Sequence, residues 1–288
     1  MNPPETMKHG RMTDPFYFEY IRRDASYNMM VNHYHPFYEI YYLLSGERMY
    51  FIKDTSYRIQ SGDLVFIPKN DVHKTRDAKQ PAHERMIIHF DDRFIHSMAA
   101  PQAKFLLSPF HHSTPVLRLP EKERALIHAH MQRTLDELAV KSTGYELYLA
   151  SVVTDLLLIA SRTLEQQQPV EVSHAAPMHK KISEVIRFLN VSFAEPLHLQ
   201  MIADKFFISP YYLSRMFKEM TGFTLIDYLN LTRIREAQRL LRETDRKITD
   251  IASMVGFENF SHFGKTFKKM TRTSARDYRQ QQKAAPRS

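Results

Sequence analysis

Apolar residues follow two different rhythms along this chain. In the N-terminal part they come in short β-rich runs separated by turn residues, and further on they recur at every third or fourth position. Short runs of this kind predict strands, and the longer spacing predicts amphipathic helices. The expected strands are 38–44, 48–52, 56–59, 63–67 and 84–90, with turns at 45–47, 61–63 and 68–70. Many short strands with turn signals between them favour a sandwich or a barrel.

Two long helical patterns follow the strands, at 121–141 and 145–164, and each is apolar along one side. They can pack on the barrel and on a second copy of the chain, so we expect a helical coupling and dimerisation segment at 111–166. Residues 167–177 are rich in Gln, Pro, Ala and Ser, which predicts a linker. The most apolar run, 147–160, contains an aspartate and is too short to cross a bilayer, so we expect no membrane partner.

The C-terminal part contains a repeat. Phe-Lys-x-Met-Thr occurs at 217–221 and again at 267–271, an offset of 50 residues, whereas the Ile-Ala pair at 202–203 recurs at 251–252, an offset of 49. A repeat that slips by one residue between two helical patterns predicts two helix–turn–helix units whose turns differ by one residue. A third apolar pattern between the copies predicts one helix over 224–242.

The second helix of each copy has an apolar side that can dock and a polar, basic side that stays free. Ser209 suits the N-cap of the first of these helices, and Pro210 suits its first position. A major groove admits one α-helix, whose Arg and Lys side chains can read guanine edges or pair with phosphates. Helix 224–242 is about 28 Å long, and could hold the two reading helices roughly 34 Å apart, one duplex turn. Two matched basic copies argue against the alternative, a helical bundle with solvated basic faces.

This segment, over about 179–279, resembles the AraC/XylS family of bacterial transcription regulators. The shared motifs are Tyr-Leu-Ser-Arg-Met-Phe-Lys at 212–218, Arg-Ile-Arg-Glu-Ala-Gln-Arg-Leu-Leu at 233–241 and Ile-Ala-Ser-Met-Val-Gly-Phe at 251–257. The resemblance implies an all-α DNA-binding domain at 178–288. The base-reading residues that it implies are Tyr211, Ser214, Arg215, Phe260, Ser261 and Lys265. The residues that we expect at DNA phosphates are Lys180, Lys181, Ser209, Lys218, Lys268 and Lys269. The family usually has Gly where this chain has Arg272, which puts the local turn geometry in question.

A second constellation lies among the predicted strands. The spacing His33-x-His35, Glu39, Gly46 is followed by Gly62, Pro68, Asn70 and His73. It resembles the two conserved segments of the cupin fold and implies a cupin-like, effector-sensing barrel at 1–110. Because alternate strand residues point to one side, His33 and His35 can converge inside it.

The role of these residues stays open at this point. In metal-binding cupins, the counterparts of His33, His35, Glu39 and His73 ligate a divalent metal, and imidazoles with a carboxylate suit zinc, iron, manganese or nickel. AraC-type sensor domains often carry the same pattern without a metal. There, the residues would hydrogen-bond a polar effector or one another. Metal binding, effector binding and a purely structural role are therefore three alternatives.

The charge is uneven along the chain. Of 40 Lys and Arg and 32 Asp and Glu in 288 residues, residues 178–288 hold 20 and 11, so the whole net charge of +8 lies in the repeated segment. A neutral part joined to a basic part fits a sensor joined to a polyanion binder. The chain has no cysteine, which excludes disulfides and thiolate chemistry and suits the cytoplasm.

Together these patterns predict a cytoplasmic transcription regulator of the α+β class with two domains and no catalytic residues. Its expected partners are double-stranded DNA, a small-molecule effector (a sugar is favoured), RNA polymerase and a second copy of the chain. Resemblance favours activation. One alternative is a cupin metalloenzyme with an accessory DNA-binding module, which needs bound metal with an open coordination position. Another is a DNA-binding protein whose barrel serves only for assembly.

Overall fold

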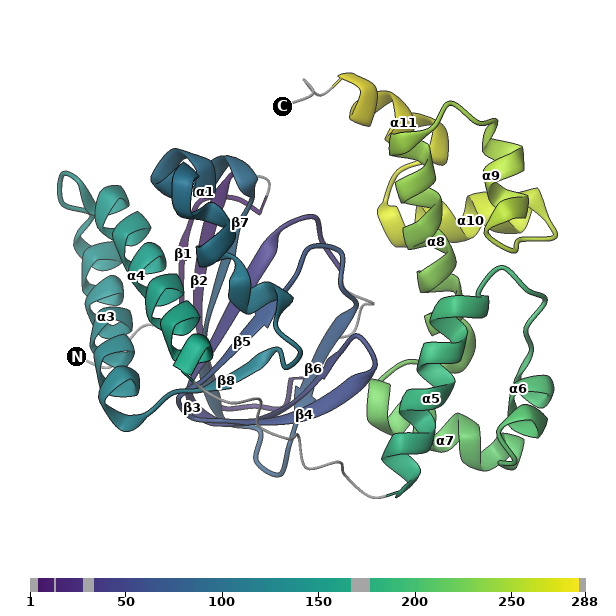
Figure 1. Cartoon of the computed structure of the whole chain (residues 1–288), viewed down its shortest axis with the longest axis horizontal. Coiled ribbons are helices and arrows are strands. Elements are labelled where there is room, and N and C mark those ends of the chain that lie inside the picture. Colours follow the sequence, from purple (N-terminus) through teal and green to yellow (C-terminus); the bar gives the residue numbers. More distant parts are fainter. Residues whose placement is uncertain (1–4, 13, 28–33, 167–176, 285–288) are drawn as a thin grey trace. The chain divides into compact units, whose positions relative to one another are not determined.

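The computed structural model of the chain describes residues 5–12, 14–27, 34–166 and 177–284 (Figure 1). Its internal contacts divide the chain into two units, 1–173 and 174–288. The first unit combines an antiparallel sheet with helices and the second is all-α, as the sequence predicted. The predicted linker at 167–177 lies outside the described residues except for its last position, where a helix begins.

The first unit is built on antiparallel strands. They are β1 (Thr6–His9), β2 (Phe16–Arg23), β3 (Tyr38–Ile52), β4 (Thr55–Gln60), β5 (Asp63–Ile67), β6 (His73–Asp77), β7 (His83–Phe90) and β8 (Val116–Arg118). The strand order is β1-β2-β7-β3-β5-β8, and β4 and β6 pair with the C-terminal half of β3. One strand, β3, thus belongs to both halves of the barrel.

The predicted turn at 45–47 is wrong. Strand β3 continues through these residues, and its pairing with β7 shifts register between Leu43 and Ser45. Gly46 takes a left-handed φ of 90° there. A bulge of this kind bends a strand without ending it, so β3 passes from one half of the barrel into the other.

The two faces of the sheet are buried in different surroundings. Ile40, Tyr42 and Leu44 pack with the helices in one large core. Tyr41 and Leu43, which alternate with them, lie in a smaller core with residues of β4, β5 and β7. This smaller core is the inside of the barrel, and Glu39 shares its side of β3 by the period of two.

Helices cover the outer face of the sheet within this unit (Figure 1). They are α1 (Asp92–Ala99), α2 (Ala103–Leu106), α3 (Glu121–Val140) and α4 (Tyr145–Gln166), with 3₁₀ turns at Ala100–Gln102 and Ser108–His111. Sequence analysis found α3 and α4 but not α1, α2, β1, β2, β6 or β8. Because β8 pairs with β5, the sheet extends beyond the predicted barrel boundary at residue 110.

Helix α4 is longer than the apolar run at 147–160. Its 22 residues are long and apolar enough to cross a membrane by length and composition, whereas the apolar run alone had looked too short. The same helix contributes buried residues such as Leu149, Val153, Leu156 and Leu157 to the large core. A core helix passes the same test of length and composition, so α4 gives only weak evidence of a membrane span.

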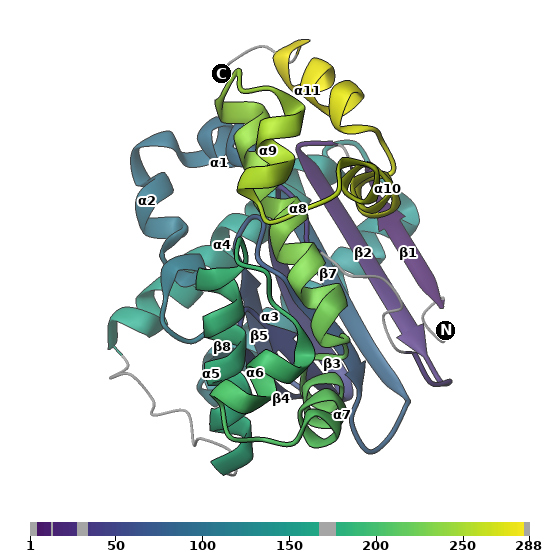
Figure 2. The same cartoon turned by 90° about the vertical axis from the view of Figure 1, so that its right-hand side faces the viewer.

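The second unit consists of helices around one central rod. They are α5 (Pro177–Ser192), α6 (Leu199–Lys205), α7 (Pro210–Thr221), α8 (Leu225–Glu243), α9 (Ile248–Met254), α10 (Phe260–Thr271) and α11 (Ala275–Ala284). Helix α8 contacts α5 and α7 toward one end and α9, α10 and α11 toward the other (Figure 1). Figure 2 shows α7 and α10 nearly end-on, so their axes run nearly parallel.

Candidate nucleic-acid interface and ligand site

Helix α7 is the second helix of the first helix–turn–helix unit. The Ser209 hydroxyl accepts a hydrogen bond from the Tyr212 N–H at 3.3 Å and so caps its N-terminus. Its inner face is formed by buried Leu213, Phe217 and Met220. Tyr211, Ser214 and Arg215, the predicted base-reading residues, are all exposed on the other side. The helix therefore presents these three side chains to solvent.

Helix α10 repeats this arrangement in the second unit. The Asn259 side chain accepts from the His262 N–H at 3.0 Å. The buried side of the helix consists of Phe263, Thr266 and Phe267. Phe260, Ser261 and Lys265 are exposed, and Phe260 leaves 51% of its surface open although it is aromatic. An exposed aromatic at the start of a reading helix can contact thymine methyl groups or sugars.

The turns inside the two units differ by one residue, as the offset of the repeat predicted. Phe207 in the first turn and Gly256 in the second both have left-handed φ, 54° and 89°. The N–H of the following residue, Ile208 or Phe257, returns to a carbonyl of the preceding helix at 3.0 Å in both. The extra residue is Glu258, which precedes the N-cap of α10.

The C-terminal ends of α7 and α10 also match. Gly222 ends α7 with φ 76°, and Arg272 ends α10 with φ 65°. Their N–H groups donate to the carbonyls of Lys218 and Lys268 at 2.8 and 2.9 Å. The absence of glycine at 272 leaves the turn geometry unchanged, but an L side chain in this conformation costs about 1–2 kcal/mol.

The predicted phosphate-binding residues lie at the surface. Lys180, Ser209, Lys218, Lys268 and Lys269 are exposed, and Lys181 is half-buried. Within the described parts of the chain, none of these lysines, nor Arg215 or Lys265, forms an ion pair. Their positive charge is therefore available to a polyanion.

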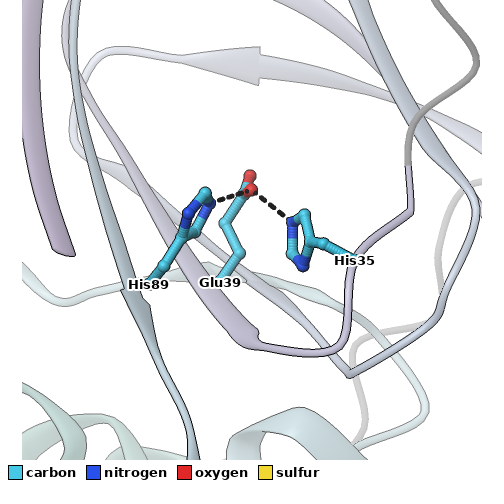
Figure 3. A group of neighbouring side chains, drawn as sticks. All are labelled: His35, Glu39 and His89. Atoms are coloured by element: carbon cyan, nitrogen blue, oxygen red, sulfur yellow. Dashed lines mark hydrogen bonds and ion pairs between the residues drawn. The ribbon is translucent and has the colours of Figure 1, made fainter. Parts of the chain in front are cut away.

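Inside the barrel, a buried carboxylate is surrounded by imidazoles (Figure 3). Glu39 Oε2 lies 3.0 Å from His35 Nε2 and 2.7 Å from His89 Nε2. Its other oxygen, Oε1, accepts from the Tyr50 hydroxyl at 2.8 Å. His73 Nε2 lies further away, 3.7 Å from Glu39 Oε2. All of these side chains are at least nine-tenths buried.

Hydrogen bonding and charge keep this carboxylate ionised. Burial alone raises the pKa of Glu39, but the charge of His73 and the hydrogen bonds from His35 and His89 together hold its pKa well below the ordinary value. His35 Nδ1 also lies 3.1 Å from the Phe37 carbonyl oxygen. Both carboxylate oxygens of Glu39 therefore have partners within this buried cluster.

Further polar side chains continue along the inside of the barrel. Arg48, fully buried, donates to Thr75 Oγ1 at 3.2 Å and to the Tyr27 carbonyl at 2.6 Å, and it pairs with Asp77. On β7, Arg85 pairs with Glu19 of β2 at 3.4 Å. Buried polar groups cost free energy unless they are paired, and each of these arginines has at least one partner.

Two family models match the chain. The AraC-like ligand binding domain matches residues 15–148, and a helix-turn-helix domain matches residues 202–281. The chain belongs to the AraC/XylS family. It is a DNA-binding transcription regulator with a cupin-like ligand-binding domain.

Relatives within the AraC/XylS family share most of its length. The HTH-type transcriptional activator RhaS of Citrobacter koseri is 28% identical over 252 residues, covering 86% of this chain and 87% of that protein. RhaS of Escherichia coli O81 is 26% identical over the same length and shares. Among solved structures, ToxT from Vibrio cholerae is 16% identical, with 92% and 98% coverage and a TM-score of 0.40. The DNA-binding domain of AdpA with a target DNA is 24% identical, with 35% and 92% coverage and a TM-score of 0.35. Because these TM-scores are low, the assignment stands on the sequence comparisons.

In this AraC-family barrel, the predicted effector residues come together only in part. His35 and Glu39 are in contact, His73 lies at the edge of the cluster, and His33 lies outside the described residues. Sequence analysis missed His89, which is the direct cross-strand neighbour of Glu39 on β7. His89 lies in the expected strand 84–90, where alternate residues point to one side, and this alternation was the signal that could have found it.

The cluster also has the donor set of a metal site. One ligand atom each from His35, Glu39 and His89 lies within 4.8 Å of the others. Two imidazoles and a carboxylate suit zinc or iron, so these residues fit a divalent ion, with His89 in place of the predicted His33. A bound ion would act as a Lewis acid toward a hydroxyl or carbonyl group of a ligand.

Proposed function

We propose that this chain activates transcription when a small polar molecule, a sugar or a close relative, binds inside its barrel. The RhaS relatives, which are named transcriptional activators, support activation. The buried polar cluster around Glu39 supports a polar ligand. The observation that carries the proposal is the pair of parallel helices, α7 and α10, with unpaired basic outer faces.

In this proposal, α7 and α10 read bases and the surrounding lysines bind phosphates. Replacing Arg215 by Ala should cost about 1–3 kcal/mol on the cognate site and relax specificity at one position. Replacing Lys218 by Ala should weaken binding evenly on all sequences and lower the salt slope by about one. The measurement is fluorescence anisotropy on operators obtained by in vitro selection with the full chain. An equal loss on every sequence for Arg215→Ala would reassign Arg215 to phosphate binding.

Effector binding must act by shifting a population between arrangements of the chain. A ligand can do this only if it binds one arrangement more tightly than another. We expect the effector to raise the affinity for the operator by the same factor by which the operator raises the affinity for the effector. Titrating each in the presence and absence of the other tests this, and unequal factors would contradict it.

Dimerisation through α3 and α4 is part of the proposal. Three apolar side chains on these helices are exposed: Leu126 at 47%, Val140 at 72% and Leu147 at 74%. Sedimentation of the full chain at micromolar concentration tests the dimer, with Leu147→Glu as the variant expected to weaken it and Glu146→Gln as its control. A monomer at that concentration would remove this part. We also propose RNA polymerase as a partner, because an activator of transcription acts on it, and the cytoplasm as the place where both work.

The alternative is a cupin metalloenzyme with an accessory DNA-binding module. The regulator relatives favour the non-enzymatic function, and we propose no catalytic residue and no required cofactor. Metal analysis of the purified protein separates the two. Stoichiometric metal whose removal abolishes turnover of a small substrate would support the enzyme. DNA binding by metal-free protein supports the regulator.

A further inference from the structure

The inside of the barrel has more hydrogen-bond donors than the protein itself satisfies. On the side of β7 that faces inward, Arg85 is 95% buried, since only 5% of its surface is exposed. One of its nitrogens, Nη2, donates to Glu19 at 3.4 Å. Its other two, Nε and Nη1, have no hydrogen-bond partner among the described residues. A buried guanidinium with two nitrogens that lack an acceptor lowers the stability of the fold, unless a bound ligand accepts from them.

Tyr41, a neighbour of Arg85, carries another buried donor without an acceptor in the described part of the chain. The guanidinium carbon of Arg85 is 5.8 Å from the centroid of the Tyr41 ring. Tyr41 is fully buried, and its hydroxyl has no partner among the described residues either. The two residues come from neighbouring strands, because Arg85 pairs with Leu43 in the ladder and Tyr41 with Ile87. Three donor atoms without a partner in the described structure therefore lie on two neighbouring side chains.

The nearby carboxylates do not accept from these donors, because their oxygens face other partners. Both oxygens of Glu19 have partners, Tyr17 and Lys8 on one and Arg85 on the other. Both oxygens of Glu39 have partners in the cluster of Figure 3 and in Tyr50. What the site lacks is an anionic hydrogen-bond acceptor. A carboxylate or a phosphate group is such an acceptor.

Within the described residues, His83 lacks a hydrogen-bond donor, whereas Arg85 and Tyr41 lack an acceptor. It precedes Arg85 by two residues on the same inward side of β7 and is 2% exposed. Its Nδ1–H donates to the Pro81 carbonyl at 2.8 Å, and its Nε2 has no partner among the described residues. Burial lowers its pKa to about 4, and the charges of Arg48, Arg85 and Arg23 add to this against the Pro81 hydrogen bond. The ring is therefore neutral at pH 7, and Nε2 can only accept, as from a hydroxyl.

We infer that the effector is a hydroxylated acid, whose acid group binds Arg85 and Tyr41 and whose hydroxyl donates to His83. This rests on the proposed function, since it specifies the class of small molecule that the barrel senses. The class comprises sugar acids and sugar phosphates, which share an anionic group and vicinal hydroxyls. A neutral sugar would leave the guanidinium of Arg85 with weaker, uncharged acceptors.

The test compares matched pairs of compounds on the full chain by thermal unfolding and isothermal titration. The pairs are D-galactose with D-galacturonate, and D-glucose with D-gluconate and with D-glucose 6-phosphate; acetate and inorganic phosphate are minimal anions. A compound that binds only the folded state raises its melting temperature. We expect an acid to raise it more than its neutral partner does, and the carboxylate and phosphate arms to show which acid the site prefers. Arg85→Gln should weaken the acid about tenfold to a hundredfold, since it removes a charged hydrogen bond.

The matched control is Arg22→Gln, which removes the same charge from the neighbouring strand β2 at a partly exposed position paired with Glu84. It should leave the response to acids unchanged. Arg85→Lys keeps the charge and should retain part of the binding. Neutral sugars that stabilise as well as acids do, or an acid response that survives Arg85→Gln, would overturn the inference and leave the proposed sensor standing. No response to any acid or minimal anion would also overturn it, and operator binding, measured separately, would still decide the regulator.

Discussion

The carboxylate of Glu39 is the feature whose removal should weaken the barrel most. Replacing it by Gln keeps the size of the side chain, and the amide oxygen can still accept from Tyr50. The amide nitrogen cannot accept, so the N–H groups of His35 and His89 lose their acceptor at sites where both rings are about 95% buried. Each buried group left unpaired costs about 1–3 kcal/mol, and breaking a buried ion pair on one side costs about 3–5 kcal/mol. We therefore expect a loss of about 3–5 kcal/mol.

Differential scanning calorimetry of the full chain measures this loss. In a unit of 150–250 residues, 1 kcal/mol shifts the melting temperature by about 2–4 °C, so the barrel transition should fall by roughly 6–20 °C. The helical unit is separate from the barrel, so its own melting transition serves as an internal reference.

The control is Glu47→Gln on the same strand, where the carboxylate pairs with Arg58 at the surface at 2.7 Å. An exposed pair contributes about 0–1 kcal/mol, so this variant should hardly change the transition. Were Glu39→Gln to melt within about 1 °C of the wild type, less than the shift for 1 kcal/mol, the idea that this carboxylate organises the cluster would be refuted.

Three further predictions concern single positions. Arg272→Gly should stabilise the helical unit by about 1 kcal/mol, because glycine takes the left-handed φ at no steric cost. Gly222→Ala should destabilise the unit for the same reason. Chemical denaturation measures both free energies of unfolding, and a lower value for Arg272→Gly would contradict the argument. Leu213→Ala should cost about 2–5 kcal/mol and undock α7, while Ser214→Ala on the exposed side should be nearly neutral; equal effects would show that α7 is not packed as described. Since the folded-state pKa of His83 is about 4 against an ordinary 6.5, its neutral form stabilises the fold above pH 6.5, and this contribution is lost as pH falls from 6.5 to 4. His83→Gln should flatten this pH dependence by on the order of 3 kcal/mol at most, and an unchanged profile would exclude His83 as its source.

The helical unit was predictable because each of its elements repeats a local pattern. Phe263 and Phe267 lie four residues apart, so their burial on one side of α10 follows from helical spacing alone. The one-residue slip in the repeat also predicted that the two turns differ by one residue, which is Glu258 in the structure. Local signals suffice where a helix docks through a single face.

The barrel was harder because its strands are buried on both faces. Strand β2 shows no clean alternation of buried and exposed positions, so its pattern gave no signal. Gly46 was interpreted as a turn, but whether a glycine ends a strand or bulges it depends on the partner strand. The pairing of Glu39 with His89, 50 residues apart, depends on the same long-range register, and a local motif does not contain it.

The parallel axes of α7 and α10 have a consequence for the genes that this chain controls. A two-fold symmetric dimer of single reading helices recognises a palindrome, which looks the same from either direction. Here one polypeptide carries two helices of different sequence, α7 and α10, in a fixed order on either side of α8. If both helices read bases, as proposed above, a single copy recognises an asymmetric sequence, and its binding site has a polarity. Inverting that site relative to the start of transcription would then reverse the direction in which the chain lies on the DNA. Regulation would depend on the orientation of the site as well as on its sequence.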